Sequence, residues 1–355
     1  MPTKLSRRDF LRLAAGSAAA ISMSGFLAPF MAQAVAEGTV PKVIWIQGAS
    51  CTGCSVSLLN TVHPDIAEVL TKIISLQFHP NVMASAGDQA MEIIHNLAAN
   101  EKGKYILAFE GAVPLEADGR YCMVGEKNGK PIMMKDLVKE VGSNAKMILN
   151  IGTCSAYGGI PAAGPNPTGC VSVQEVVGNV VPYVNIAGCP PHPDWIVGTI
   201  AHAVLYPNKP IETDANGRPK MFYGGIIHDN CPRRQYFDNG IFAKNFSEPG
   251  CLIEIGCKGP IAHCDSTTRL WNGGVNWCIK AGAPCLACTE PEFPNAAGIY
   301  NRMAEMPVGP RITATVDEVA LGLTGLTALG IAGHLGGNVL TGRIGPKHDE
   351  KEGDN

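Results

Sequence analysis

Charged and aromatic residues are scarce in this chain of 355 residues. Asp, Glu, Lys and Arg together supply 17% of the sequence, the aromatic residues supply 6%, and the formal net charge is −3. Because the chain has no basic excess, we expect no nucleic-acid partner. The apolar content of 46% supports a sizeable core, and the length leaves room for two modest domains with tails.

The N-terminal segment has the pattern of an export signal. Arg7 and Arg8 form a twin-arginine motif, and an apolar, alanine-rich run follows as far as Ala36, where Ala-x-Ala triplets suit signal cleavage. A surface amphipathic helix or a membrane anchor is the alternative interpretation. We expect a twin-arginine signal peptide at residues 1–36, which directs the protein to the periplasm.

Short apolar runs alternate with segments of helical periodicity from residue 42 to residue 205. The predicted strands are residues 42–47, 74–78, 105–109, 147–151 and 184–186. The predicted helices are residues 88–100, 134–141 and 194–205, and helical spacing also follows Cys54 as far as Ile73. This alternation is typical of an α/β protein with a doubly wound parallel sheet.

The pattern changes at Pro207, where turn residues accumulate. Little regular structure is predicted between residues 211 and 308. A segment of this length without regular elements is unusual unless another interaction holds it. Bound metal clusters can do so, because their binding energy substitutes for apolar burial.

Cysteine is abundant, with 13 copies. Four copies lie just beyond the carboxyl ends of three predicted strands, where doubly wound sheets bind ligands: Cys51, Cys54, Cys154 and Cys189. Seven more follow His228: Cys231, Cys251, Cys257, Cys264, Cys278, Cys285 and Cys288. From the residues alone, disulfides, zinc sites and iron–sulfur clusters all remain open, since Cys-x-x-Cys pairs serve zinc as well as clusters.

A largely apolar run covers residues 319–341. As a helix it would be about 35 Å long, which is enough to cross a bilayer. His334 and Asn338 would share one face of that helix. A buried amphipathic helix packed on the body is the alternative. We expect a C-terminal transmembrane helix at 319–341 and a cytoplasmic tail at 342–355.

Five motifs resemble those of the small subunits of periplasmic nickel–iron hydrogenases. They are Cys51-Thr-Gly-Cys54, Gly152-Thr-Cys-Ser-Ala-Tyr-Gly-Gly159, Gly188-Cys-Pro-Pro-His-Pro-Asp-Trp195, His228-Asp-Asn-Cys231 and Gly256-Cys-Lys-Gly-Pro260. The signal and the apolar tail also resemble the membrane-associated members. The resemblance implies a flavodoxin-like domain at residues 37–206 and an irregular iron–sulfur cluster domain at residues 207–310.

The resemblance also implies three clusters and their ligands. A proximal 4Fe–4S cluster would be held by Cys51, Cys54, Cys154 and Cys189. A distal 4Fe–4S cluster would be held by His228, Cys231, Cys251 and Cys257. A medial cluster would be held by Cys264, Cys278, Cys285 and Cys288. Cys122 and Cys170 are left as buried, inert thiols. Gly53 and Ala162 stand where oxygen-tolerant relatives have additional cysteines, so an ordinary proximal cubane is expected.

The medial set departs from the family pattern. The first medial ligand ordinarily stands at the place of Ser266, whereas Cys264 lies two residues earlier. Cys278 follows Trp277, where most relatives have proline and a 3Fe–4S cluster; the nickel–iron–selenium branch shares this cysteine. We therefore predict a medial 4Fe–4S cluster, with an inert thiol at Cys278 as the alternative.

The function that the resemblance implies is electron transfer during hydrogen oxidation. A nickel–iron centre in the large subunit of a heterodimer would split H2, and the acceptor would be a membrane cytochrome b, a multihaem cytochrome c or a quinone-reactive subunit. The protein would act at the periplasmic face of the cytoplasmic membrane. The alternatives are an exported zinc- or disulfide-stabilised binding protein and the cluster subunit of a quinone oxidoreductase, which lacks the export signal and the cysteine-rich second half.

Overall fold

The computed structural model describes residues 40–127, 129–295, 298–301, 306–309, 312–314 and 316–344. The chain forms two compact units, Met1–Arg302 and Met303–Asn355, and each is described by itself. The predicted signal peptide lies outside the described residues, as does the tail from residue 345 onward.

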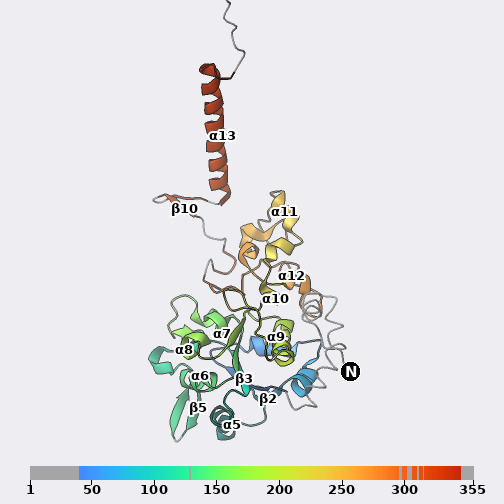
Figure 1. The fold of residues 1–355 in the computed structure, drawn as a ribbon, viewed down its shortest axis with the longest axis vertical. Helices are drawn as coiled ribbons and strands as arrows, with labels where there is room; N and C mark the ends of the chain where they lie inside the picture. The colour runs from blue at the N-terminus through green and yellow to red at the C-terminus, as the bar shows by residue number, and fades with distance from the viewer. Residues whose placement is uncertain are drawn as a thin grey trace, which may run out of the picture. The chain divides into compact units, whose positions relative to one another are not determined.

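A parallel sheet of five strands forms the centre of the first unit (Figure 1). Its spatial order is β2 (Ser75–Phe78), β1 (Lys42–Gln47), β3 (Tyr105–Glu110), β7 (Met147–Ile151) and β9 (Tyr183–Ile186). Numbered along the chain, these strands have the order 2-1-3-4-5, which is the flavodoxin-like arrangement. The predicted doubly wound sheet is therefore confirmed.

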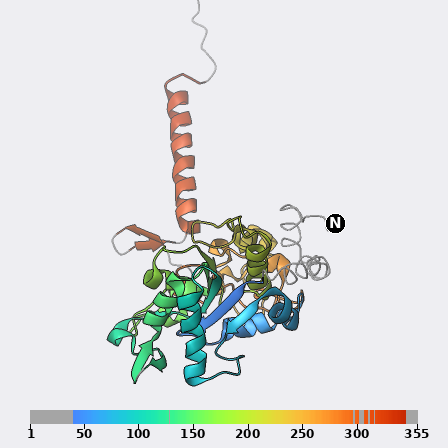
Figure 2. The same ribbon diagram turned by 60° about the horizontal axis from the view of Figure 1, so that its bottom comes forward.

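Helices lie on both faces of this sheet (Figures 1 and 2), and an apolar layer fills the space on each face. Alternate residues of β1 enter different layers, with Val43 and Trp45 in one and Ile44 and Ile46 in the other. The first layer includes residues of α3 (Gly53–Leu59) and α9 (Pro193–Leu205). The second includes residues of α5 (Gly87–Asn100), α6 (Met134–Ser143) and α8 (Val173–Val177). Burial on both faces explains the nearly continuous apolar strands.

The remaining elements before residue 206 are short. The helical turns are α4 (Ile66–Glu68), η1 (Val69–Ile73), η2 (Glu116–Gly119), α7 (Thr153–Tyr157) and η3 (Ile160–Ala162). Two antiparallel ribbons join β4 (Val113–Pro114) to β8 (Cys170–Val171) and β5 (Met123–Lys127) to β6 (Lys130–Met133). The sequence did not predict these ribbons, because β4 has only two residues and β5 is mostly exposed, so neither shows an apolar alternation.

Between α9 and residue 301, the described residues form only brief helical turns, as predicted. They are α10 (Lys220–Tyr223), η4 (Ile227–Asn230), α11 (Arg234–Asp238), η5 (Leu252–Ile255), η6 (Gly259–Ile261) and α12 (Ser266–Arg269). The apolar layer beside α9 continues into this segment through Phe222, Leu252 and Trp277. The domain division at residue 206 stays a prediction, since one core joins the two parts.

The second unit contains a hairpin and a long helix. Strand β10 (Met306–Gly309) pairs with β11 (Ile312–Ala314), and α13 (Val316–Leu340) follows. The predicted C-terminal helix is therefore present. Within the described residues, no helix combines the length and apolarity that crossing a membrane requires.

Candidate metal centres

Three turns at the carboxyl ends of the parallel strands carry the first group of cysteines. Strand β1 leads to Cys51 and then to Cys54 in α3, β7 leads to Cys154 in α7, and β9 leads to Cys189. The sheet order reverses between β1 and β3. Doubly wound sheets bind ligands at this topological switch point, so the turns lie where the fold favours a site.

Glycine allows these turns to approach one another. Gly152 has a φ of 89°, and a Cβ at this position would stand 2.6 Å from the Sγ atom of Cys54. The Gly152 N–H donates to the carbonyl of Ile186 at 2.9 Å, and the Thr153 N–H donates to the carbonyl of Gly188 at 3.0 Å. The turn after β7 is thereby held against the turn after β9 and against Cys54, and only glycine fits this approach.

The four thiols of this group act on one another electrostatically. Burial raises the pKa of Cys54 well above its usual range, and Glu110, Cys154, Cys189 and Cys51 raise it further. Burial also raises the pKa of Cys154 to about 11. Thiols with raised pKa values keep their protons near neutral pH unless a cation replaces them. The structure thus brings together the four residues expected at the proximal site.

A buried carboxylate anchors the first cysteine turn, and sequence reasoning missed it. Glu110 ends β3 and is 1% exposed. Its Oε1 accepts hydrogen bonds from the Cys54 N–H at 3.1 Å and the Ser50 hydroxyl at 3.0 Å. Its Oε2 accepts from the Ser55 N–H at 3.1 Å and from the Trp45 indole at 3.1 Å. The sequence contained one sign of this role, because Glu110 is a charged residue at the end of an otherwise apolar strand.

The second group lines one cavity in the irregular segment. His228, Cys231, Cys251 and Cys257 all border this cavity. Burial raises the pKa of the three thiols, and for each of them the charge of another thiol in the group raises the pKa further. Gly256 precedes the last cysteine with a φ of 95°, and a Cβ there would meet the backbone of Tyr300 at 2.4 Å. The four residues expected at the distal site therefore meet in the structure.

The imidazole of His228 is suited to bind a metal in this cavity. Its Nε2 atom is buried and has no hydrogen-bond partner among the described residues. Burial, and then the Arg234 guanidinium, lower the pKa of His228, which favours the neutral imidazole that metals bind. Phe237 packs edge-on against the ring, with centroids 4.7 Å apart. An orphaned buried nitrogen beside three thiols fits a metal ligand.

The third group consists of Cys264, Cys278, Cys285 and Cys288. Burial raises the pKa of Cys264 to about 12, and Cys278 also raises it. Burial raises the pKa of Cys288, and the thiols of Cys278 and Cys264 raise it further. Burial raises the pKa of Cys285, and Cys288 is among the thiols that raise it further. Ser266 is buried and hydrogen-bonds to the Cys264 thiol. The four residues expected at the medial site therefore lie together, with Ser266 beside Cys264.

Two hydrogen bonds connect the three groups in a fixed order. The Thr153 hydroxyl, next to Cys154 of the first group, donates to the carbonyl of Cys288 in the third. The Cys285 N–H of the third group donates to the Sγ of Cys257 in the second at 3.4 Å. The group expected at the medial site is therefore hydrogen-bonded to both the group expected at the proximal site and the group expected at the distal site.

All 13 cysteines are free thiols. Cys170 is buried as expected, whereas Cys122 is only half-buried, and the pKa of Cys122 is raised by burial and then by Cys170. In the part of the chain that the structure describes, no three His, Cys, Asp or Glu lie close enough to hold a single metal ion.

Two family models match different parts of the chain. Residues 51–203 match the family described as NADH ubiquinone oxidoreductase, 20 Kd subunit. Residues 223–301 match the family described as the C-terminal part of the NiFe/NiFeSe hydrogenase small subunit. The first match covers the three turns that carry the first cysteine group, and the second covers the cysteine-rich second half, which the quinone oxidoreductase alternative lacks.

Similar proteins agree with the second match. The periplasmic [NiFeSe] hydrogenase small subunit of Desulfomicrobium baculatum is 45% identical over 305 residues, which cover 82% of this chain and 96% of that protein. The hydrogenase-2 small chain of Escherichia coli K12 is 39% identical over 337 residues, covering 90% and 88%. The solved [NiFeSe] hydrogenase of Desulfovibrio vulgaris Hildenborough matches with a TM-score of 0.71 and 47% identity, covering 74% of this chain and 98% of that chain.

The resemblance found in the motifs is therefore confirmed over most of the chain. Small subunits of such hydrogenases carry three iron–sulfur clusters and transfer electrons, while the nickel–iron centre lies in the large subunit with which they form a heterodimer. The residues described above fit that cofactor content. The chain belongs to the family of NiFe/NiFeSe hydrogenase small subunits.

Proposed function

We propose that twelve side chains of this chain hold the three clusters. The proximal ligands are Cys51, Cys54, Cys154 and Cys189. The medial ligands are Cys264, Cys278, Cys285 and Cys288. The distal ligands are His228, Cys231, Cys251 and Cys257. When bound, the clusters supply one-electron carriers. The observation that carries this proposal is the pair of hydrogen bonds that join the groups, Thr153 to Cys288 and Cys285 to Cys257.

Exposed residues at the two ends of the series indicate where electrons enter and leave the chain. Cys51 and Cys189 are exposed, and the nearby helix α3 exposes Val56 and Leu59. Exposed apolar side chains beside a redox site suit a partner interface. We assign this face to the large subunit, which delivers electrons from hydrogen oxidation. The opposite end of the series is the cavity of His228, whose neighbours Asp229 and Asn230 are exposed.

The acceptor at the His228 end belongs to the membrane. We propose a cytochrome b, a multihaem cytochrome c or a quinone-reactive subunit, in agreement with export by the twin-arginine motif at Arg7 and Arg8. Helix α13 supports membrane attachment, because large apolar side chains are exposed along its length, among them Leu321, Leu329 and Leu340. Truncation after Pro310 should release soluble enzyme that still reduces dyes, and a truncated enzyme that stays with the membrane would contradict attachment by α13.

Metal analysis of the co-purified heterodimer tests the ligand assignment. Three cubanes predict about 12 iron atoms and as many acid-labile sulfides in the small subunit. The nickel–iron centre adds one further iron in the large subunit. Loss of Cys51 or Cys54 should remove the proximal signal and abolish dye reduction by hydrogen. A heterodimer with zinc in place of iron, or with disulfides among these twelve residues, would refute the assignment.

A further inference from the structure

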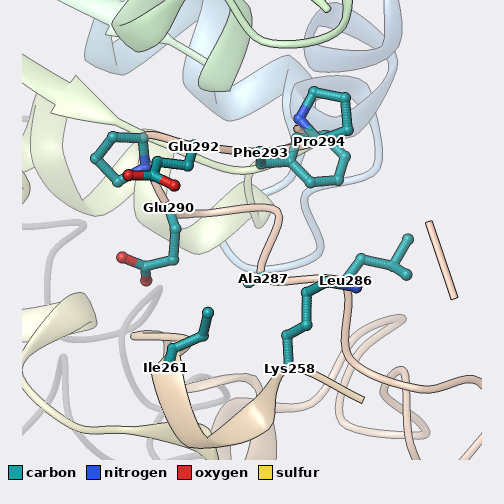
Figure 3. Close-up of a pocket in the computed structure, with 9 residues that line it drawn as sticks. Lys258, Ile261, Leu286, Ala287, Glu290, Glu292, Phe293 and Pro294 are labelled. Carbon is teal, nitrogen blue, oxygen red and sulfur yellow. The ribbon is translucent and has the colours of Figure 1, made fainter. Parts of the chain in front are cut away.

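Lys258 is a buried cation between two of the cysteine groups. It directly follows Cys257, and its residue is 2% exposed. Figure 3 shows its side chain beside Ile261 and Ala287 on the wall of a cavity of about 340 Å³. Lysine seldom occurs in such a place, because removing an ammonium group from water is costly.

The hydrogen bonds of Lys258 match its charged form. The Nζ atom donates to the carbonyl oxygens of Gly298 at 2.8 Å, Gly256 at 3.3 Å and Asn301 at 3.4 Å. Three acceptors correspond to the three N–H donors of an ammonium group, whereas a neutral amine has two. Among the residues that the structure describes, no carboxylate forms an ion pair with this side chain. The direct partners of its charge are therefore three neutral carbonyl dipoles.

The backbone of Lys258 connects the medial group to the distal group. Its N–H donates to the carbonyl of Cys285 at 2.7 Å. The Cys285 N–H in turn donates to the sulfur of Cys257 at 3.4 Å. Burial lowers the pKa of Lys258, and the thiols of these same two cysteines, Cys285 and Cys257, act in the opposite direction and raise it. Lys258 thus stands at the junction that an electron crosses between the medial and distal sites.

We propose that Lys258 is a positioning residue for electron transfer, a fixed positive charge that raises the reduction potentials of the medial and distal sites relative to the proximal site. This inference rests on the proposed ligand assignment. Each added electron makes a site more negative by one charge, and a cation in a poorly hydrated interior stabilises that charge more strongly than one in water. The electron enters from the proximal side and leaves toward the acceptor, and the proposed role of Lys258 includes no proton transfer.

Lys280 offers a matched control. Like Lys258, it lies close to a cysteine of the groups, two residues after Cys278. Unlike Lys258, it is exposed, and its Nζ atom donates to the carbonyl of Val275 at 2.9 Å. Solvent and salt screen an exposed charge. A charge effect that depends on burial should therefore appear at Lys258 and be absent at Lys280.

The test is a potentiometric titration of the heterodimer followed by electron paramagnetic resonance. The variants are Lys258→Gln and Lys258→Met, which remove the charge, Lys258→Arg, which keeps it and can extend into the adjoining cavity, and Lys280→Gln. We expect the neutral Lys258 variants to shift the medial and distal potentials to more negative values and to leave the proximal potential unchanged. Lys258→Arg should restore the medial and distal potentials, and Lys280→Gln should shift none.

The possible outcomes separate the two proposals. Unchanged medial and distal potentials in fully loaded Lys258→Gln would overturn the role of Lys258 alone. Neutral variants that lose the medial or distal cluster while Lys258→Arg keeps both would show that the residue holds the loop, which also overturns the electrostatic role. A wild-type heterodimer without three cluster signals would instead refute the ligand assignment.

Discussion

The backbone N–H of Cys285 donates a hydrogen bond to the sulfur of Cys257, with an N–S distance of 3.4 Å. These residues stand 28 positions apart and belong to different cysteine groups. Hydrogen bonds to a coordinating sulfur raise the reduction potential of the site that it serves. Under the proposed ligand assignment, this hydrogen bond joins a medial ligand to the sulfur of a distal ligand.

Replacing Cys278 should change the medial site from four iron atoms to three. Cys278 acts electrostatically on Cys264 and Cys288, and we infer that it supplies the fourth corner of a cubane. In Cys278→Pro we expect a strong three-iron signal in the electron paramagnetic resonance spectrum of the oxidised enzyme, together with the loss of about one iron atom. Cys122→Ala, which alters a thiol outside the three groups, should leave the spectrum unchanged. A strong three-iron signal in the unmodified enzyme would refute the fourth ligand.

Replacing His228 should slow electron exit without stopping hydrogen activation. His228→Ala removes the Nε2 atom that we propose as a distal ligand, and we expect dye reduction to fall about tenfold or more. Hydrogen–deuterium exchange at the nickel–iron centre should persist, because the large subunit performs it. His228→Cys restores a ligand and should recover a large part of the rate. Equal loss of both activities in His228→Ala would indicate a folding role.

Much of the fold could be predicted because its elements are local. The strand at Lys42–Gln47 is a short, continuous apolar run, and the helix at Gly87–Asn100 buries apolar residues at helical intervals, so both can be identified from the sequence. The first cysteine turn follows from strand ends and the switch-point rule. The grouping of the irregular segment followed from the family resemblance, since no periodicity relates Cys264 to Cys288.

Contacts between distant loops could not be predicted. Cys264 lies two residues before the usual ligand position, so its approach to Cys278 and Cys288 was expected from the family resemblance and not from spacing. The same limit applies to Glu110 and Lys258, whose partners lie in other loops. Such contacts arise from tertiary packing, which leaves no regular interval in the sequence.

Neutralising Glu110 should weaken the first cysteine turn. The two carboxylate oxygens accept hydrogen bonds from Cys54, Ser55, Ser50 and Trp45. In Glu110→Gln an amide N–H group takes the place of one acceptor and faces these donors, at a cost of about 3 kcal/mol. We expect proximal iron to be lost earlier than medial and distal iron during thermal unfolding. The exposed Glu126→Gln is the control, and identical iron release from both variants would contradict the anchoring role.

Adding one methyl group at Gly152 should prevent binding of the proximal cluster and leave the other two clusters in place. A Cβ at Gly152 would stand 2.6 Å from the Cys54 sulfur, and the residue has a φ of 89°. Gly178 has a similar φ of 73° but nothing within 4 Å of a Cβ. Gly178→Ala therefore measures the backbone strain alone, about 1 kcal/mol, and should keep all clusters. Gly152→Ala adds displacement of Cys54, so we expect about 4 fewer iron atoms per heterodimer and no dye reduction by hydrogen, with medial and distal signals retained after chemical reduction. If the two variants keep equal iron contents, the close approach of Gly152 to Cys54 is not required for loading the proximal site.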